Sequence, residues 1–458
     1  MLQLTIKPHR TYLRANAGEQ KLFVMLKFLP SPEAARARPR VDLAVVIDTS
    51  GSMREPAPGA AITPIPTKPV VVDGKTYTGT FEGPTKLDVA MDAARALVAS
   101  PNLSPDDVVS LIQFDDDSRI VVRAAQAGSG RADLVRGIES LTGFSGGTQM
   151  ARGLRNAVDV LGSEQGTARK VLLLTDGRTV DEEECGAAAT ELAARHAPIV
   201  ALGVGEEYNE DLLAAICSTT LGRPYDLRDM SSLPQIFETE LGSTANQVIA
   251  DVRLTVRTVR EVKLVSAMRA YPSLSDIDSS GETLPLGTIE AGDHTVFILE
   301  FDIPPRPPLR VRLAQLGVTY QVPAQQYRGE ISPQDLIVEF TTDEALAAQV
   351  DPEVMGYVQQ RNVDNLIRQA TQQAAQNPVQ AAKTLQLARS MTQRLGNHAM
   401  TQALGRAEEE LASKGTIAIG TAKTIKLGAR TQTMKAGGPD TNLDNLPSEE
   451  EIRRLTGA

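Results

Sequence analysis

The segment Leu43-Ala-Val-Val-Ile47-Asp48-Thr-Ser50-Gly-Ser52-Met53 joins five apolar residues directly to a run of acidic and hydroxyl side chains. An apolar run without polar alternation is typical of a strand buried on both faces of a parallel sheet. In doubly wound sheets, ligands bind beyond the carboxyl ends of the strands, where the strand order reverses. The segment therefore predicts an α/β fold with a polar site after its first strand.

Strand-like and helical patterns alternate around this segment, from Val41 to about Val248. Val171-Leu-Leu-Leu174 is a second unbroken apolar run. The alternation favours a doubly wound, Rossmann-like domain with a mostly parallel sheet. The predicted strands are 41–47, 108–114, 119–125, 170–175 and 199–204, and the predicted helices are 86–99, 131–141, 150–161, 181–196, 209–221 and 232–248.

Segments on both sides of this region show the period-two alternation of strands that have one buried face. Two such runs lie between Leu2 and Leu29, and about five lie between residues 250 and 342. Two isolated strands could not bury a core. We therefore expect one antiparallel β-sandwich into which the α/β domain is inserted.

The C-terminal part changes composition twice. Residues 343–414 are rich in Ala, Gln and Arg at helical spacing, and Asn377-Pro378 is a typical helix start. Helices are predicted at 352–376, 378–395 and 398–413, and the Thr- and Lys-rich residues 415–458 are predicted to be mostly disordered. The predicted parts are thus 1–40, 41–249, 250–342, 343–414 and 415–458.

Composition narrows the possible classes of protein. The 458 residues carry a formal charge of −10, which argues against a broad nucleic-acid surface. The two cysteines form no metal-binding or disulfide pattern, and no apolar stretch is long enough to span a membrane. The start of the sequence has no secretory-signal pattern. We therefore expect a cytoplasmic protein without a membrane partner.

The motif Asp48-Thr-Ser50-Gly-Ser52, with Thr148 in Phe144-Ser-Gly-Gly-Thr148 and Asp176 in Thr175-Asp176-Gly177, resembles the von Willebrand factor A family in its bacterial cytoplasmic form. The resemblance covers about Val41 to Val248 and includes the metal-ion-dependent adhesion site of that family. It implies that Ser50, Ser52 and Thr148 bind the metal directly, and that Asp48 and Asp176 act mostly through water.

The residue types agree with such a site, because hydroxyls and carboxylates are hard oxygen ligands that suit Mg²⁺ or Mn²⁺. The alternative is that Asp48-Thr-Ser50 is only a turn that caps a helix. The family implies an open metal position that an acidic group on a protein partner completes. We expect a metal-dependent protein-interaction module of a bacterial regulatory or signalling complex, and no enzyme; the alternative is an adaptor of an AAA+ ATPase or chelatase-like machine.

One feature complicates a simple transfer of that binding mode. Residues 55–85 form an insertion after the motif, with a hairpin signal at Asp73-Gly74. The insertion either shapes partner contacts or is a tolerated surface loop.

Gly143-Phe-Ser145-Gly-Gly147 matches a hydrolase nucleophile elbow, with Asp176 and His196 following, but the helical pattern before it argues against that chemistry.

The Thr-rich tail suggests a second kind of partner. Thr424 and Thr431 each follow a basic residue closely, and Thr424 has an aliphatic residue three positions later. Because bacterial proteins of the resembling type are often associated with Ser/Thr kinases, the sequence suggests phosphorylation and recognition by a forkhead-associated domain. The alternative is an inert basic tail.

Overall fold

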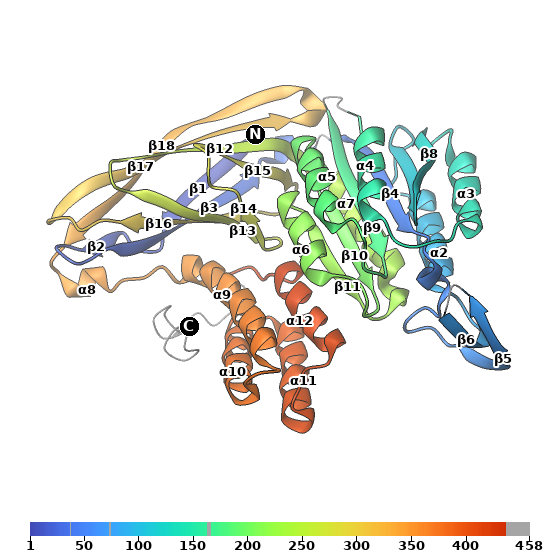
Figure 1. Cartoon of the computed structure of the whole chain (residues 1–458). Coiled ribbons are helices and arrows are strands. Elements are labelled where there is room, and N and C mark those ends of the chain that lie inside the picture. The colour runs from blue at the N-terminus through green and yellow to red at the C-terminus, as the bar shows by residue number, and fades with distance from the viewer. Residues whose placement is uncertain (37, 73–74, 163–165, 437–458) are drawn as a thin grey trace.

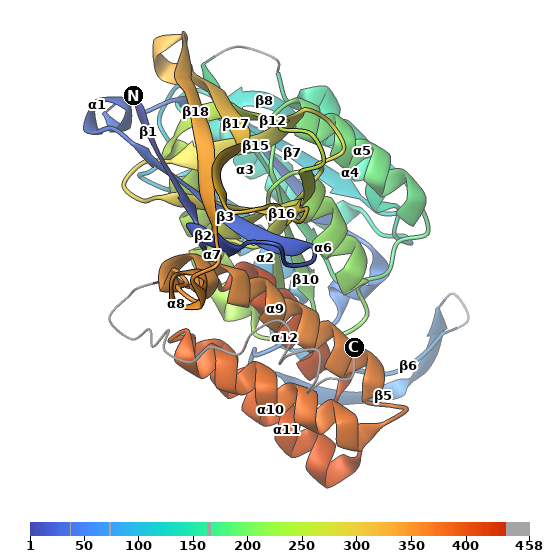
Figure 2. The same cartoon turned by 90° about the vertical axis from the view of Figure 1, so that its left-hand side faces the viewer.

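The computed structural model describes residues 1–36, 38–72, 75–162 and 166–436. Three bodies pack together in it: a β-sandwich, an α/β domain and a bundle of C-terminal helices that lies against both (Figures 1 and 2). No helix among these residues combines the length and apolar character needed to cross a membrane.

The α/β domain is built on a six-stranded sheet in the order β11-β10-β9-β4-β7-β8. All neighbouring strands pair in parallel except β7 and β8, which form a hairpin. Its strands are β4 (Arg40–Asp48), β7 (Val108–Phe114), β8 (Ser118–Gln126), β9 (Thr167–Thr175), β10 (Ile199–Val204) and β11 (Arg223–Leu227). Strand β11 is missing from the sequence prediction, because Arg-Pro-Tyr-Asp-Leu is short and contains Pro and charges.

Helices cover both faces of this sheet, as the unbroken apolar strands require. Side chains of α2, α3 and α7 share one core with Leu43, Val45 and Ile47, while those of α4, α5 and α6 share the other with Ala44 and Val46. The helices are α2 (Lys86–Ala99), α3 (Arg131–Ser140), α4 (Met150–Val160), α5 (Glu182–Ala194), α6 (Glu210–Thr219) and α7 (Leu233–Ala245), with the 3₁₀ turns η1 (Gly51–Arg54), η2 (Leu141–Gly143) and η3 (Met230–Ser232). This is the expected doubly wound, Rossmann-like fold.

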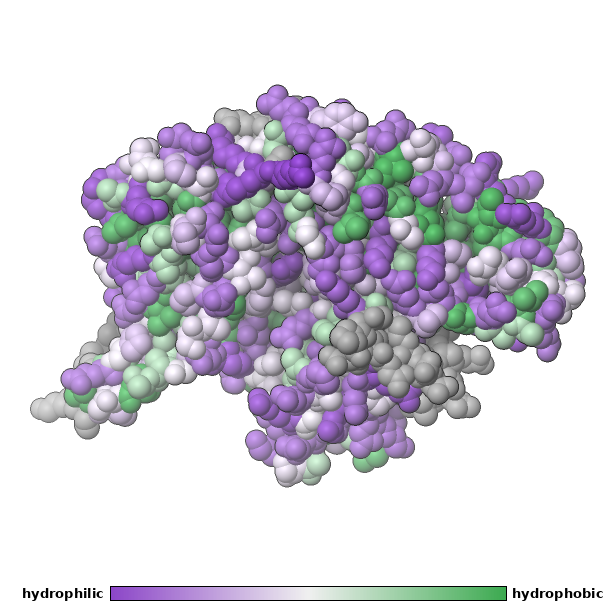
Figure 3. Space-filling view, turned by 180° about the vertical axis from the view of Figure 1, so that it is seen from behind, coloured by the Kyte–Doolittle hydropathy of each residue, from purple (hydrophilic) through white to green (hydrophobic). Residues whose placement is uncertain are grey.

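The insertion after the motif forms an antiparallel hairpin of β5 (Thr63–Val72) and β6 (Lys75–Glu82) that projects from the body (Figures 1 and 3). The hairpin agrees with the sequence signal, although Asp73 and Gly74 themselves lie outside the described residues. Backbone bonds close its stem, from Lys86 to Glu55 and from Ala57 to Pro84. The flanking chain therefore continues into α2 as if the insertion were absent.

The N-terminal strands and those after the α/β domain form two facing five-stranded sheets, in the orders β1-β3-β16-β13-β14 and β15-β12-β17-β18-β2. Strand β3 lies between β1 and β16, which confirms that the N-terminal strands pair with strands after residue 250. The strands are β1 (Leu2–Pro8), β2 (Tyr12–Arg14), β3 (Gln20–Pro30), β12 (Gln247–Thr258), β13 (Lys263–Tyr271), β14 (Ser275–Ile277), β15 (Thr283–Glu290), β16 (Thr295–Ile303), β17 (Leu309–Val322) and β18 (Tyr327–Thr341), with α1 (Pro32–Ala35) and η4 (Pro323–Gln325).

One detail of the sandwich differs from the expectation of a purely antiparallel fold. Strand β2 pairs in parallel with β18, through Leu13 and Phe340. Both side chains are buried in the core between the two sheets. The short strand β2 thus crosses to the second sheet, and the N-terminal segment contributes to both layers.

The C-terminal helices correct the prediction of a disordered tail from residue 415. The helix α12 follows the three expected helices, and its Ile425 and Leu427 are buried. Residues 437–458 lie outside the described part of the chain. The helices are α8 (Glu344–Ala347), α9 (Pro352–Gln373), α10 (Pro378–Arg394), α11 (His398–Lys414) and α12 (Ile419–Thr431).

Two cores hold α12 in place. Ile425 and Ala429 pack among α9, α10 and α11, whereas Leu427 enters the core of the α/β domain. Salt bridges join the same surfaces, since Lys426 pairs with Glu210 at 3.0 Å. The helix therefore joins the bundle to the α/β domain.

Candidate metal centre

The five residues predicted to hold a metal come from three loops at one edge of the sheet. Asp48 ends β4, and Ser50 and Ser52 follow it; Asp176 follows β9; Thr148 precedes α4. Strands β4 and β9 are neighbours, but the chain leaves β4 towards β7 and returns on the other side to β9. The loops therefore meet at the point where the strand order reverses, which is where such folds bind ligands.

Hydrogen bonds connect the side chains of Ser50, Ser52 and Asp176, and they tie the Asp48 carboxylate to the backbone of Ser50. Ser52 Oγ donates to Asp176 Oδ1 at 2.7 Å and lies 3.1 Å from Ser50 Oγ. Asp48 accepts from the Ser50 backbone N–H at 2.9 Å and from Thr175 Oγ1 at 2.8 Å. The two strand-ending carboxylates thus lie against the hydroxyls of the motif loop.

Thr148 faces the same group across Gly177. A Cβ atom on Gly177 would lie 3.5 Å from Thr148 Oγ1 and 4.0 Å from Ser52 Oγ. The two loops are also tied directly, since the Gly51 N–H donates to the Gly146 carbonyl at 3.0 Å. The structure therefore brings all five predicted residues together and leaves room between the hydroxyls that a methyl group would occupy.

The electrostatics of the centre are those of two close, buried carboxylates. Asp48 is fully buried. Burial and, as the next largest cause, the negative charge of Asp176 together raise the pKa of Asp48 to about 7, although hydrogen bonds from Ser50 and Thr175 act in the opposite direction. A cation at this edge would relieve the repulsion between the two carboxylates.

Lys86 is a further member of the centre that sequence reasoning missed. Its Nζ atom lies 2.7 Å from Asp176 Oδ2 and 2.8 Å from Glu55 Oε2. Burial alone would lower the pKa of Lys86, but the two carboxylates raise it overall. The 31-residue separation between Glu55 and Lys86 hides this pair in the sequence, because only the closed hairpin stem brings them together.

The donor set fits a small, hard divalent cation. Hydroxyl and carboxylate oxygens converge at this edge. Its ligands are therefore mainly hydroxyls, and within the described ranges no group of three or more His, Cys, Asp or Glu side chains forms a metal cluster of the other kind. Mg²⁺ and Mn²⁺ accept such oxygen ligands and retain water molecules. Ser50, Ser52 and Thr148 would hold the ion, with Asp48 and Asp176 supplying the negative charge.

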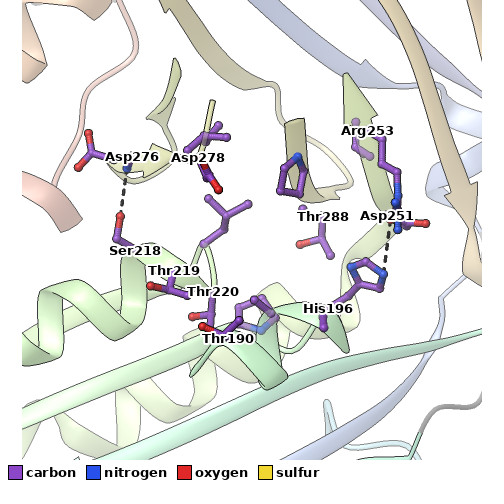
Figure 4. A pocket seen from close by; sticks show the side chains of 18 of the residues that line it. Thr190, His196, Ser218, Thr219, Thr220, Asp251, Arg253, Asp276, Asp278 and Thr288 are labelled. Carbon is purple, nitrogen blue, oxygen red and sulfur yellow. Dashed lines mark hydrogen bonds and ion pairs between the residues drawn. The ribbon is translucent and has the colours of Figure 1, made fainter. Parts of the chain in front are cut away.

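A cavity of about 930 Å³ lies elsewhere, between the ends of α5 and α6 and the sandwich strands β12, β14 and β15 (Figure 4). His196 and Asp251 approach to 3.5 Å there, and none of the five predicted metal ligands lines it. His196 lies before β10, whereas Ser145 lies beyond the opposite ends of the strands. The hydrolase-like order of Ser145, Asp176 and His196 therefore does not correspond to an assembled triad.

Comparison with known proteins agrees with this fold. Residues 42–239 match the von Willebrand factor type A domain, so the α/β part of the chain is a domain of that family. Domains of this family commonly act as metal-dependent modules for protein interaction. Protein sll0103 of Synechocystis sp., which is uncharacterized, is 24% identical over 277 residues. This match covers 58% of the chain and 65% of that relative, so the chain spans less than two thirds of the relative's length.

Two solved structures share the arrangement of nearly the whole chain. A von Willebrand factor type A protein from Catenulispora acidiphila is 17% identical with a TM-score of 0.76, covering 94% of this chain and 97% of its own. The ArnB paralog VWA2 from Sulfolobus acidocaldarius is 14% identical with a TM-score of 0.56, covering 95% and 99%. At these identities the similarity concerns the fold alone.

Proposed function

We propose that this protein is a metal-dependent protein-interaction module in which Asp48, Ser50, Ser52, Thr148 and Asp176 hold Mg²⁺ or Mn²⁺. The observation that carries the proposal is the convergence of three hydroxyls and two carboxylates at the strand-order reversal. The ion supplies a positive charge with an exchangeable position, and an acidic side chain of a protein partner fills that position.

The surroundings of the centre support partner binding at this edge. Val180 is 81% exposed, and its backbone N–H donates to the Thr148 carbonyl, so an aliphatic side chain stands beside the proposed ion. The hairpin of β5 and β6 emerges from the same loop (Figure 1). A partner that presents a carboxylate next to apolar residues would match these features.

We place the module in a cytoplasmic bacterial regulatory or signalling complex and assign it no enzymatic activity. The alternative is an adaptor subunit of an AAA+ ATPase or chelatase-like machine, in which the metal edge would contact the motor. The packing of α12 into both the bundle and the von Willebrand factor type A domain suits either role. The identity of a co-purifying partner separates them, because only the adaptor would bring down an ATPase.

Phosphorylation of Thr424 and Thr431, with recognition by a forkhead-associated domain, remains part of the proposal but acquires a condition. Thr424 Oγ1 donates to Asp226 Oδ2 at 2.6 Å, and Thr431 Oγ1 donates to the Pro224 carbonyl. A phosphate on Thr424 would lie against a carboxylate and be repelled by it. A kinase could therefore reach these threonines only after α12 has dissociated from the von Willebrand factor type A domain.

Affinity purification from the native cells tests the proposed function. Wild type in Mg²⁺ should retain a partner, while wild type in EDTA and Asp48→Ala in Mg²⁺ should lose it. Leu427→Ala removes a core side chain outside the metal centre. It is the control that separates a loss of metal binding from a general loss of structure. Equal recovery of the partner with wild type and Asp48→Ala would contradict the proposal.

A further inference from the structure

Lys86 occupies a position that is electrostatically unfavourable for a lysine. It is the first residue of α2, where the helix carries a partial positive charge that repels a cation. It is also only 8% exposed, and burying an ammonium group is strongly unfavourable unless a partner compensates its charge. Contacts at this site must therefore offset both costs.

The compensating partner belongs to the metal centre. Asp176 Oδ2 contacts Lys86 Nζ, while Asp176 Oδ1 accepts the hydrogen bond of Ser52. One carboxylate thus connects the ammonium group to the hydroxyl cradle. The second partner, Glu55, is more than half exposed and belongs to the start of the insertion.

The ammonium group is not required to close the hairpin stem. The backbone bonds of Lys86 to Glu55 and of Ala57 to Pro84, each 3.0 Å, already join the two ends. The Lys86 side chain adds a charge contact to Asp176 that the stem itself does not need. A role in the electrostatics of the centre therefore accounts for its position.

We propose that Lys86 is an internal counter-ion of the metal centre, which competes with the divalent cation for Asp176 and so limits how tightly the cation is held. The inference rests on the proposed function, because it requires an ion at the five residues. Ionised Asp48 and Asp176 together carry two negative charges, and Lys86 cancels one of them. The lower net negative charge of the centre weakens binding of the divalent cation. It also leaves the bound cation with more residual positive charge to attract a partner's carboxylate.

Calorimetric titration of the full chain with Mn²⁺ tests the inference. Lys86→Met should bind Mn²⁺ on the order of tenfold more tightly than wild type, since one repelling charge next to the ion is gone. Lys86→Arg keeps the charge and should stay within about threefold of wild type. Arg152→Met is the matched control: it removes a positive charge from α4 that pairs with the exposed Asp117, and should change the affinity less than about twofold.

Thermal melting provides a second readout. In EDTA, Lys86→Met should melt at a lower temperature than wild type, because the two carboxylates lose their counter-ion. Saturating Mn²⁺ should then raise its melting temperature more than it raises that of wild type. If Lys86→Met does not fold, Glu55→Gln is used in its place, because Glu55 is exposed. In Glu55→Gln the Lys86 ammonium group loses its second carboxylate partner and pairs with Asp176, so this variant should bind Mn²⁺ more weakly than wild type.

The outcomes separate the inference from the proposed function. Unchanged or weaker Mn²⁺ binding by folded Lys86→Met, or tighter binding by Glu55→Gln, would overturn the counter-ion role while the metal centre stands. Absence of Mn²⁺ binding by wild type would overturn both.

Discussion

At the scale of single residues, Gly177 keeps the space between the hydroxyls free. We expect Gly177→Ala to weaken Mn²⁺ binding about tenfold or more, because its methyl group would lie 3.5 Å from Thr148 Oγ1, within the volume that the proposed ion would occupy. The melting temperature in EDTA should hardly change, since 3.5 Å from Thr148 Oγ1 and 4.0 Å from Ser52 Oγ are ordinary van der Waals distances for the new methyl group. Calorimetry and a thermal melt measure both effects, and undiminished Mn²⁺ binding would place the ion elsewhere.

Glu240 is the residue at which pH should act on stability. It is buried, with its Oε2 atom 2.7 Å from Lys170 Nζ. Burial alone would raise the pKa of Glu240, but the charges of Lys170 and Arg223 outweigh burial and lower this pKa to about 2. Because this pKa lies below the ordinary value of 4.5, the folded state binds fewer protons than the unfolded state between about pH 2 and pH 4.5. The stabilisation is therefore complete above about pH 4.5 and is lost as the pH falls towards 2.

We expect Glu240→Gln to lower the free energy of unfolding at pH 7 by about 3 kcal/mol, because Lys170 loses the carboxylate with which it pairs. The variant should also lose stability less steeply than wild type between pH 4.5 and 2. Denaturant unfolding over a pH series measures both, with Mn²⁺ affinity at pH 7 as a control that should not change. Parallel pH profiles for the two proteins would show that the pKa of Glu240 is not lowered.

The sequence predicted the candidate ligands but not their electrostatic setting. Asp48, Ser50, Ser52, Thr148 and Asp176 follow from motif spacing and strand ends, and the structure gathers them as expected. Lys86 could not be predicted, because its role depends on a hairpin stem closing over residues 55–85. Helical periodicity identifies its helix but not the carboxylate that its side chain reaches.

At the scale of secondary-structure elements, α12 should be essential for holding the bundle against the von Willebrand factor type A domain. We expect Leu427→Ala to destabilise the protein by about 2–4 kcal/mol, because Leu427 is buried in that domain's core. Ile419→Ala is the matched control on the same helix, since Ile419 is 64% exposed and should lose less than about 0.5 kcal/mol. Equal melting temperatures for the two variants would contradict the docking of α12.

Two of the elements that the sequence did not reveal, α12 and β11, depend on tertiary contacts. Helix α12 contains Gly420, Gly428 and several threonines, which are poor helix formers. It forms because its apolar residues are shared between two cores and its basic residues meet acidic ones. Strand β11 is likewise defined by its parallel pairing with β10 and not by its own composition.

At the scale of the whole molecule, the two ends of the sandwich depend on each other. Deleting residues 1–30 should unfold the segment 250–342, because β3 lies between β1 and β16 and contributes Leu22, Val24 and Leu26 to the core. Amide exchange of the truncated chain should show loss of protection in β12–β18. Unchanged protection there would mean that the later strands fold without the N-terminal ones.

The central claim is that the edge formed by the ends of β4 and β9 holds a divalent cation. Calorimetric titration of wild type and Asp48→Ala with Mn²⁺, with circular dichroism to verify the fold of both, tests it most directly. We predict that wild type binds Mn²⁺ and that Asp48→Ala keeps its secondary structure but loses the binding. Equal Mn²⁺ affinity in the two proteins would contradict the account.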